Sequence, residues 1–264
     1  MSIHINNFYS NILKRYVETR VILPEPMDND GNVLPEFTKG NKKLPTIWLL
    51  HGLGGDSSIW LRRTSIEQLA TQYQVAVVMP QTERGFYTNM FQGPNYWDFL
   101  TKELPDRMQF IFPLSTKKSD NYLIGNSMGG YGALRWALTF PEKFNAVAAL
   151  SPVTNLAKFK TEQAKTMPDF DLAFNSDELS GSNIDIEYLL NHLEDSSSLN
   201  VLITTGSDDI LRNMDQASKS QFSNVFKDNF TWRKDPGQHN WTLWNKQLPI
   251  VMKWLFNKGE QYAN

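Results

Sequence analysis

The chain contains no cysteine, no long apolar run and only four histidines. Without cysteine the protein cannot form disulfide bonds, thiolate metal sites or a cysteine nucleophile. No run reaches the roughly 18 apolar residues of a membrane-spanning helix, and the N-terminus lacks the basic and apolar segments of a secretory signal. We therefore expect a cytoplasmic protein that does not act at a membrane.

Charges of the two signs are nearly balanced, with 26 Lys and Arg against 28 Asp and Glu. The net charge is −2 and no basic block is present, so nucleic acid is not an expected partner. A small-molecule substrate is the expected ligand. The 264 residues, 41% of them apolar, suffice for one large core, so we expect a single domain over residues 1–264.

The sequence Gly-Asn-Ser-Met-Gly at positions 125–129 lies between a strand-like apolar run and a helix-like run from Met128 to Thr139. This G-x-S-x-G pattern is typical of a nucleophile elbow, in which a serine stands on a tight strand-to-helix turn. The flanking glycines relieve crowding there, and the next backbone N–H faces the reacting carbonyl. The pattern indicates acyl transfer through Ser127.

A second glycine-rich turn, His-Gly-Leu-Gly-Gly at positions 51–55, follows the apolar strand-like run Thr46–Leu50. This order fits an oxyanion loop, whose backbone N–H groups bind the negative charge that develops on the carbonyl oxygen. We assign the two donors to the amides of Leu53 and Met128. The turn could instead only link a strand to a helix or hold a phosphate, but no Lys-Ser/Thr pair follows the glycines, which excludes a P-loop.

A serine hydroxyl needs a base, and the four histidines differ in their position along the chain. We expect His4, in an N-terminal polar segment, and His192, in a helical stretch, to be structural. His51 precedes the oxyanion loop and is interpreted as an orienter of that loop. His239 follows the serine, in a loop before the final amphipathic helix, and is the best candidate for the base.

The acid of a triad should lie between serine and histidine in this type of hydrolase. A buried-strand run that ends near Thr205 leads into Gly206-Ser207-Asp208-Asp209, so two carboxylates lie at the C-terminal end of one strand. Either carboxylate could orient His239, and the local pattern does not choose between Asp208 and Asp209. Both could also only cap the helix that follows.

Strand-like and helix-like runs alternate along most of the chain, which predicts a mostly parallel sheet with helices on both faces. In such a sheet ligands bind beyond the C-terminal ends of the strands, where all the candidate residues fall. The pattern loosens between residues 153 and 198, which we interpret as a small insertion that caps the site, although an ordinary surface excursion fits as well. Arg15–Leu23 is expected as a strand of an N-terminal antiparallel pair, and a polar hairpin or loop is expected at Met27–Lys43. The further expected strands are Thr46–Leu50, Val75–Met79, Tyr122–Ile124 and Ala146–Leu150, with helices at Trp60–Tyr73, Tyr96–Ile111 and Met128–Thr139.

Several aromatic residues lie near the proposed site segments, and such side chains commonly line pockets for apolar acyl groups. Most should belong to the core. Three are the candidates for substrate contact: Trp60, Tyr131 and Trp241.

Together these segments resemble the esterase D-type branch of the α/β-hydrolases, and most closely the bacterial tributyrin esterases, over nearly the entire chain. The residue before the serine is a departure, because Asn126 stands where His or Leu is more usual. The resembling segments are Leu49-Leu-His-Gly-Leu-Gly-Gly-Asp, Trp60-Leu-Arg-Arg-Thr, Val78-Met-Pro, Phe86-Tyr-Thr-Asn, Glu103-Leu-Pro, Gly125-Asn-Ser-Met-Gly-Gly-Tyr-Gly-Ala-Leu, Gly206-Ser-Asp-Asp-Ile-Leu and His239-Asn-Trp-Thr-Leu-Trp.

The resemblance implies an α/β-hydrolase fold and a carboxylesterase for short-chain acyl esters that uses neither metal nor cofactor. Carried over residue by residue, it makes Ser127 the nucleophile, Asp209 the acid and His239 the base, with Leu53 and Met128 as oxyanion donors. Similarity extends to S-formylglutathione hydrolases, feruloyl esterases and mycolyltransferases, so a thioesterase or an acyltransferase is the alternative. A non-catalytic binding module on the same fold is a further alternative. An exposed apolar edge would allow a homo-oligomer.

Overall fold

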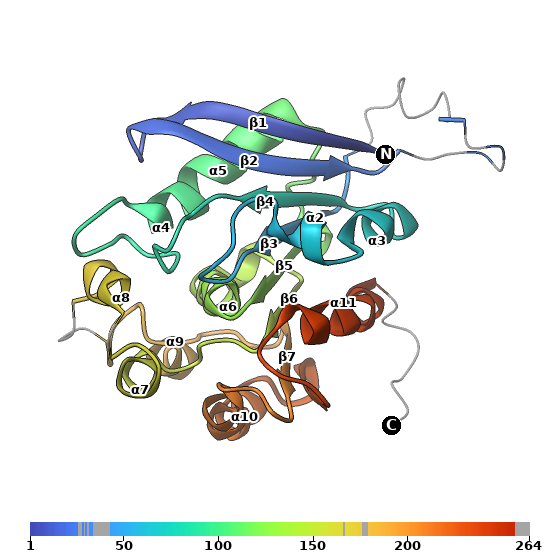
Figure 1. Cartoon of the computed structure of the whole chain (residues 1–264). Helices are drawn as coiled ribbons and strands as arrows, with labels where there is room; N and C mark the ends of the chain where they lie inside the picture. The colour runs from blue at the N-terminus through green and yellow to red at the C-terminus, as the bar shows by residue number, and fades with distance from the viewer. Residues whose placement is uncertain are drawn as a thin grey trace.

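One sheet of eight strands forms the centre of the structure, in the order β1-β2-β4-β3-β5-β6-β7-β8 (Figure 1). The computed structural model describes residues 1–25, 28, 30, 32–33, 43–165, 167–175 and 179–256. β1 and β2 form an antiparallel hairpin, β2 pairs antiparallel with β4, and all further pairings are parallel. The strands are β1 Ser2–Ser10, β2 Arg15–Leu23, β3 Thr46–Leu50, β4 Ala76–Pro80, β5 Asn121–Asn126, β6 Ala146–Leu150, β7 Asn200–Gly206 and β8 Phe230–Asp235.

Helices cover both faces of the sheet. Strand residues alternate between two apolar clusters: Trp48 and Leu50 pack on the face of α5, α6 and α10, and Ile47 and Leu49 on the face of α3 and α11. The α-helices are α2 Ile59–Arg63, α3 Ile66–Gln72, α4 Tyr96–Asp98, α5 Leu104–Ile111, α6 Met128–Thr139, α7 Leu156–Glu162, α8 Pro168–Ala173, α9 Ile186–Asn191, α10 Arg212–Phe226 and α11 Trp241–Phe256. A π-helical turn spans Phe99–Glu103, and 3-10 turns span Lys118–Asp120, Pro141–Lys143 and Lys227–Asn229.

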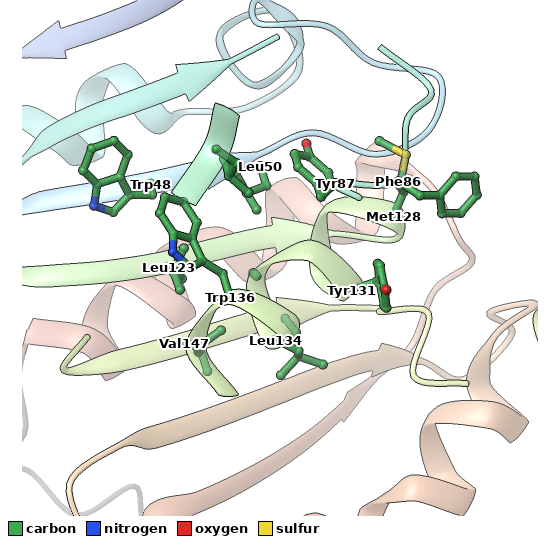
Figure 2. Packing of buried hydrophobic residues seen from close by; sticks show 14 of the residues in the cluster. Trp48, Leu50, Phe86, Tyr87, Leu123, Met128, Tyr131, Leu134, Trp136 and Val147 are labelled. Carbon is green, nitrogen blue, oxygen red and sulfur yellow. The ribbon is translucent and has the colours of Figure 1, made fainter. Parts of the chain in front are cut away.

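The core explains why the central strands are near-continuous apolar runs. Every residue of β3, β4, β5 and β6 is buried, as expected for parallel strands that are covered on both faces. Figure 2 shows α6 lying on these strands, and the Trp136 ring packs against Trp48 at 5.6 Å between ring centroids. Burial of each such side chain stabilises the folded protein by about 1.5–3 kcal/mol relative to leaving it exposed. This packing fixes α6, and with it the turn at its N-terminus.

The predicted fold class is confirmed, and four predicted elements, β2, β3, α6 and β6, have the predicted bounds. The helix predicted over Trp60–Tyr73 is instead two helices, because Thr64 leaves the helical conformation and its hydroxyl donates to the Trp60 carbonyl. The helix predicted over Tyr96–Ile111 contains the π-helical turn, which comes directly before the turn where Pro105 has no N–H to donate.

The N-terminal strand is longer than its sequence indicates. Ser2–Ser10 pairs along its whole length with β2, so His4 lies within a strand and not in a segment that precedes the strands. The polar loop expected at residues 27–43 falls largely outside the described residues. In the ranges that the structure describes, no helix is long and apolar enough to cross a membrane.

The segment between β6 and β7 contains the three short helices α7, α8 and α9, seen beside α10 in Figure 1. Two residues of α6, one helical turn apart, hold this segment just before α9. The Tyr131 hydroxyl donates to the Ile184 carbonyl (2.8 Å), and the Arg135 guanidinium donates to the carbonyl of Asn183 (3.1 Å). The helix that begins at the nucleophile elbow therefore also anchors the β6–β7 segment.

Candidate active site

Ser127 stands on the tight turn between β5 and α6, in a left-handed conformation with φ 54° and ψ −119°. Two neighbouring glycines make this turn possible. A Cβ atom on Gly125 would lie 2.1 Å from the Gly129 carbonyl oxygen, and one on Gly129 would lie 2.4 Å from the Leu50 carbonyl oxygen. The Ser127 amide is tied to the Leu150 carbonyl of β6 (2.9 Å). The serine is thus held at the C-terminal edge of the sheet.

Three predicted residues from distant parts of the chain meet at this edge. His239 Nε2 lies 2.9 Å from Ser127 Oγ, and His239 Nδ1 lies 2.9 Å from Asp209 Oδ1. The carboxylate only accepts hydrogen bonds, so the imidazole donates through Nδ1 and its Nε2 is free to accept the serine proton. Asp209 follows β7, and His239 precedes α11.

The two neighbouring carboxylates have different surroundings. Asp209 is buried, and its Oδ1 also accepts from the Leu211 amide (2.8 Å). Burial alone would raise the pKa of Asp209, but the hydrogen bond and electrostatic attraction of His239, together with Ser151 and the Leu211 amide, hold that pKa below its usual value. Asp208 is exposed and accepts from the Ser207 hydroxyl. The geometry therefore brings Asp209, and not Asp208, to His239.

The glycine-rich turn after β3 is held by His51, which is buried. Burial lowers the pKa of His51, so the imidazole is neutral. Its Nδ1 donates to the Gly52 carbonyl (2.9 Å), and its Nε2 accepts from the Thr82 amide (3.2 Å). The Tyr87 hydroxyl donates to the His51 carbonyl (2.8 Å). This arrangement matches the interpretation of His51 as an orienter of the loop.

The amides of Leu53 and Met128 lie on the two turns that flank the serine. Within the described part of the chain, neither amide donates a hydrogen bond to another protein atom. Amides left free on such turns can bind a developing oxyanion. The structure is therefore compatible with both predicted donors.

A cavity of about 470 Å³ opens at Ser127 and His239. Among the described residues that line it there is no Lys, Arg, Asp or Glu. One wall comes from the start of α11 and another from α7 and the residues after it. The remaining lining residues are Gly52, Leu53, Gly54, Gly55, Asn126, Phe159, Gln163, Met167, Ile210, Leu211, Asn240, Trp241 and Trp244.

Of the three aromatic residues expected to contact substrate, only Trp241 lines this cavity. Trp60 is 1% exposed and lies behind Trp241, edge to face at 5.1 Å between ring centroids, with its indole N–H donating to the Leu50 carbonyl. Tyr131 is fully buried and holds the β6–β7 segment. The apolar wall residues Phe159 and Ile210 were not among the residues expected from the sequence. Phe159 lies four positions, about one helical turn, before Gln163, which belongs to the same wall.

No group of three or more His, Asp or Glu residues in the described ranges is arranged as a metal site.

Comparisons with known proteins place this geometry in a family. A family model described as "Esterase: Putative esterase" matches residues 10–255. The chain is 30% identical over 273 residues to an acetyl esterase of Caldicellulosiruptor saccharolyticus, covering 97% of this chain and 98% of that protein.

Two solved structures from Staphylococcus aureus are similar, each at 30% identity. One is FphF, a fluorophosphonate-binding serine hydrolase, with a TM-score of 0.84 and coverage of 97% of this chain and 98% of that one. The other is the S-formylglutathione hydrolase FrmB, with a TM-score of 0.82 and coverage of 97% and 100%. With the esterase D resemblance thus confirmed, the chain belongs to the esterase family of the α/β-hydrolases and is a serine esterase.

Proposed function

We propose that the protein is a carboxylesterase for short-chain acyl esters that works through Ser127, His239 and Asp209. The observation that carries the proposal is the unbroken set of hydrogen bonds from Ser127 Oγ through His239 to Asp209, with both distances at 2.9 Å. Nucleophile, base and orienting acid are therefore in direct contact.

In the first step Ser127 Oγ attacks the ester carbonyl while His239 Nε2 takes the hydroxyl proton. The amides of Leu53 and Met128 bind the negative oxygen of the tetrahedral intermediate, and two such donors typically contribute ~2.7–4 kcal/mol each. The imidazolium then protonates the leaving alcohol as the bond from carbon to the alcohol oxygen breaks. An acyl-serine remains.

In the second step water attacks the acyl-serine, with His239 again as the base, and the acid is released. Asp209 keeps the imidazole in the tautomer that leaves Nε2 free, and it stabilises the imidazolium that forms in both steps. Its lowered pKa keeps the carboxyl group ionised at neutral pH.

The lining of the cavity supports a neutral ester as substrate. FrmB is an S-formylglutathione hydrolase by its description, and glutathione carries two carboxylates and an ammonium group. The cavity of the present chain offers no charged side chain among its described lining residues to bind those groups. Its apolar walls, Phe159 and Trp241 among them, suit a short acyl chain instead.

We further propose that residues 153–198 cap the site, since Phe159, Gln163 and Met167 of this segment line the cavity. Transfer of the acyl group to an alcohol in place of water uses the same residues, and added acceptor alcohols would reveal it in the products. The cytoplasmic location, the single-domain organisation and the homo-oligomer expected from the sequence stay predictions.

The proposal is tested by initial rates on p-nitrophenyl esters from acetate to decanoate, with the wild type and Ser127→Ala side by side. We expect the highest kcat/KM at two to four acyl carbons and no turnover by the variant, at an unchanged melting temperature. S-formylglutathione serves as the competing substrate. Full activity of Ser127→Ala would refute the assignment, and a preference for the glutathione thioester would refute the substrate class.

A further inference from the structure

Ser151 is the first residue after β6, the strand next to the elbow, and it is completely buried. Its φ of 46° is in the left-handed region, which costs a residue with a side chain of order 1–3 kcal/mol. The Ser151 amide donates to the Thr204 carbonyl of β7 (2.7 Å), which fixes the backbone in this conformation. A strained serine therefore lies at the C-terminal edge of the sheet, directly after Leu150, whose carbonyl binds the Ser127 amide.

The hydroxyl of Ser151 has one partner whose role is chemically fixed. Trp244 Nε1 lies 3.2 Å from Ser151 Oγ, and an indole nitrogen can only donate. The serine oxygen is therefore the acceptor in this contact. Its own proton remains available for a second partner that can only accept.

Such an acceptor lies beside it. Asp209 Oδ1 already receives two hydrogen bonds, from His239 and from the Leu211 amide. Asp209 Oδ2 is buried and receives no hydrogen bond of ordinary geometry within the described residues. Although burial acts to raise the pKa of Asp209, the Ser151 hydroxyl is close enough to be among the groups that lower it. The Ser151 hydroxyl proton is thus free to bind Asp209 Oδ2, which is buried and has no other donor among the described residues.

We propose that Ser151 is a positioning residue of the triad: its hydroxyl donates to Asp209 Oδ2 while the Trp244 indole holds its oxygen in place. The inference rests on the proposed function of Ser127, His239 and Asp209. With both carboxylate oxygens bound, the plane of the carboxylate is fixed toward His239 Nδ1. Trp244 also packs edge to face against the His239 ring at 5.0 Å, so one residue supports the base directly and the acid through Ser151.

The test uses Ser151→Ala and Ser151→Gly, which remove the same hydroxyl but differ in backbone strain. Glycine adopts a positive φ freely, so the Gly variant should be the more stable of the two. Because a hydrogen bond to a charged group is lost in both, kcat on p-nitrophenyl acetate should fall about 10- to 100-fold in both, with KM within about threefold. Ser10→Ala is the matched control, since Ser10 is a buried serine at the end of β1 that donates to Glu103. It should lose stability and keep its kcat.

A second measurement needs no substrate. The Nδ1 proton of His239 should give a far-downfield proton NMR signal in the wild type, identified by its absence in His239→Gln. In both Ser151 variants this signal should shift upfield or broaden, and in Ser10→Ala it should not. The inference is overturned if the signal is unchanged, or if kcat follows stability, so that the Gly variant retains wild-type activity while the Ala variant does not. Absence of ester turnover by the wild type would refute the proposed function, and the NMR comparison would still decide the role of Ser151.

Discussion

Gly129→Ala is a change of one methyl group that should separate the two oxyanion donors. Gly129 lies in the first turn of α6, directly against the end of β3. A Cβ atom at this position would lie 2.4 Å from the Leu50 carbonyl oxygen and 2.7 Å from that of His51. Both contacts are with backbone, so no side chain can rotate away to make room.

The size of the effect follows from these distances. A Cβ atom essentially never approaches another heavy atom within 3.0 Å, so relief of the 2.4 Å contact requires a displacement of at least 0.6 Å (3.0 − 2.4) between α6 and β3. Met128 precedes Gly129 on α6, and Leu53 follows β3 in the chain. The displacement therefore widens the gap between the two amides. A misplacement of about 1 Å can cost on the order of 100-fold in rate, so we expect kcat to fall about 10- to 100-fold.

The assay is kcat on p-nitrophenyl acetate, obtained as the maximal rate divided by the concentration of active sites titrated with a fluorophosphonate. Overpacking should also lower the free energy of unfolding by about 1–3 kcal/mol, which denaturant titration measures. Gly54→Ala is the comparison, because a Cβ atom there meets nothing within 4 Å. That variant adds only a methyl group to the cavity wall, and its kcat should stay within about threefold of the wild type. If Gly129→Ala also stays within threefold, the oxyanion assignment or the rigidity of this contact is wrong.

Three further predictions concern charge and cavity shape. Asp209→Asn should lower kcat about 10³- to 10⁴-fold, because it loses the anion that orients and stabilises the imidazole. The kcat of Asp208→Asn should stay within about threefold of the wild type, and comparable losses in both variants would contradict the geometry. Burial, and to a smaller extent the negative charge of Asp209, raise the pKa of Asp215, whose side chain accepts from the Thr205 hydroxyl. The contribution of Asp215 to the stability of the fold is therefore fully present below its pKa in the unfolded chain, about 4, and is lost as the pH rises through its pKa in the folded protein. Between pH 4 and pH 8 the melting temperature of Asp215→Asn should accordingly fall less than that of the wild type. Parallel curves of melting temperature against pH would refute this. Phe159→Ala removes an apolar wall of the cavity and should move the optimum of the p-nitrophenyl series to longer acyl chains; an unchanged optimum would place the acyl group elsewhere.

The residues that could be predicted are those whose local sequence carries its own physical signature. Ser127 stands in a glycine-flanked turn after the buried strand β5, and Asp209 follows the buried apolar strand β7. His239 is one of only four histidines and follows the serine and the acid in the chain. The bounds of β3 and β6 are predicted correctly because both strands are short apolar runs, Thr-Ile-Trp-Leu-Leu and Ala-Val-Ala-Ala-Leu. In each of these cases apart from His239, the information lies within a few residues of the position that matters.

Other features depend on contacts between distant segments. An antiparallel partner of β2 is predicted, but the bounds of β1 are not, because Ile5 and Tyr9 are exposed on an edge strand, where the apolar alternation is weak. Trp60 and Tyr131 lie near the site in the chain, but the sequence does not tell which side of a helix faces the cavity. Ser151 has no local signature at all, since its place beside Asp209 depends on the packing of Trp244 from α11.

The reacting groups lie at the edge of the sheet, whereas one wall of the cavity comes from the β6–β7 segment. This separation has a consequence for how such an enzyme diversifies. Ser127, Asp209 and His239 follow three different strands, whereas Phe159, Gln163 and Met167 come from one uninterrupted stretch of chain. Insertions, deletions or recombination within that single stretch of the gene can therefore reshape substrate preference while the reacting groups keep their places. Natural variation in this family, and any library built to alter its selectivity, should accordingly concentrate between residues 153 and 198, inside limits set by the two anchor points of α6 at Asn183 and Ile184.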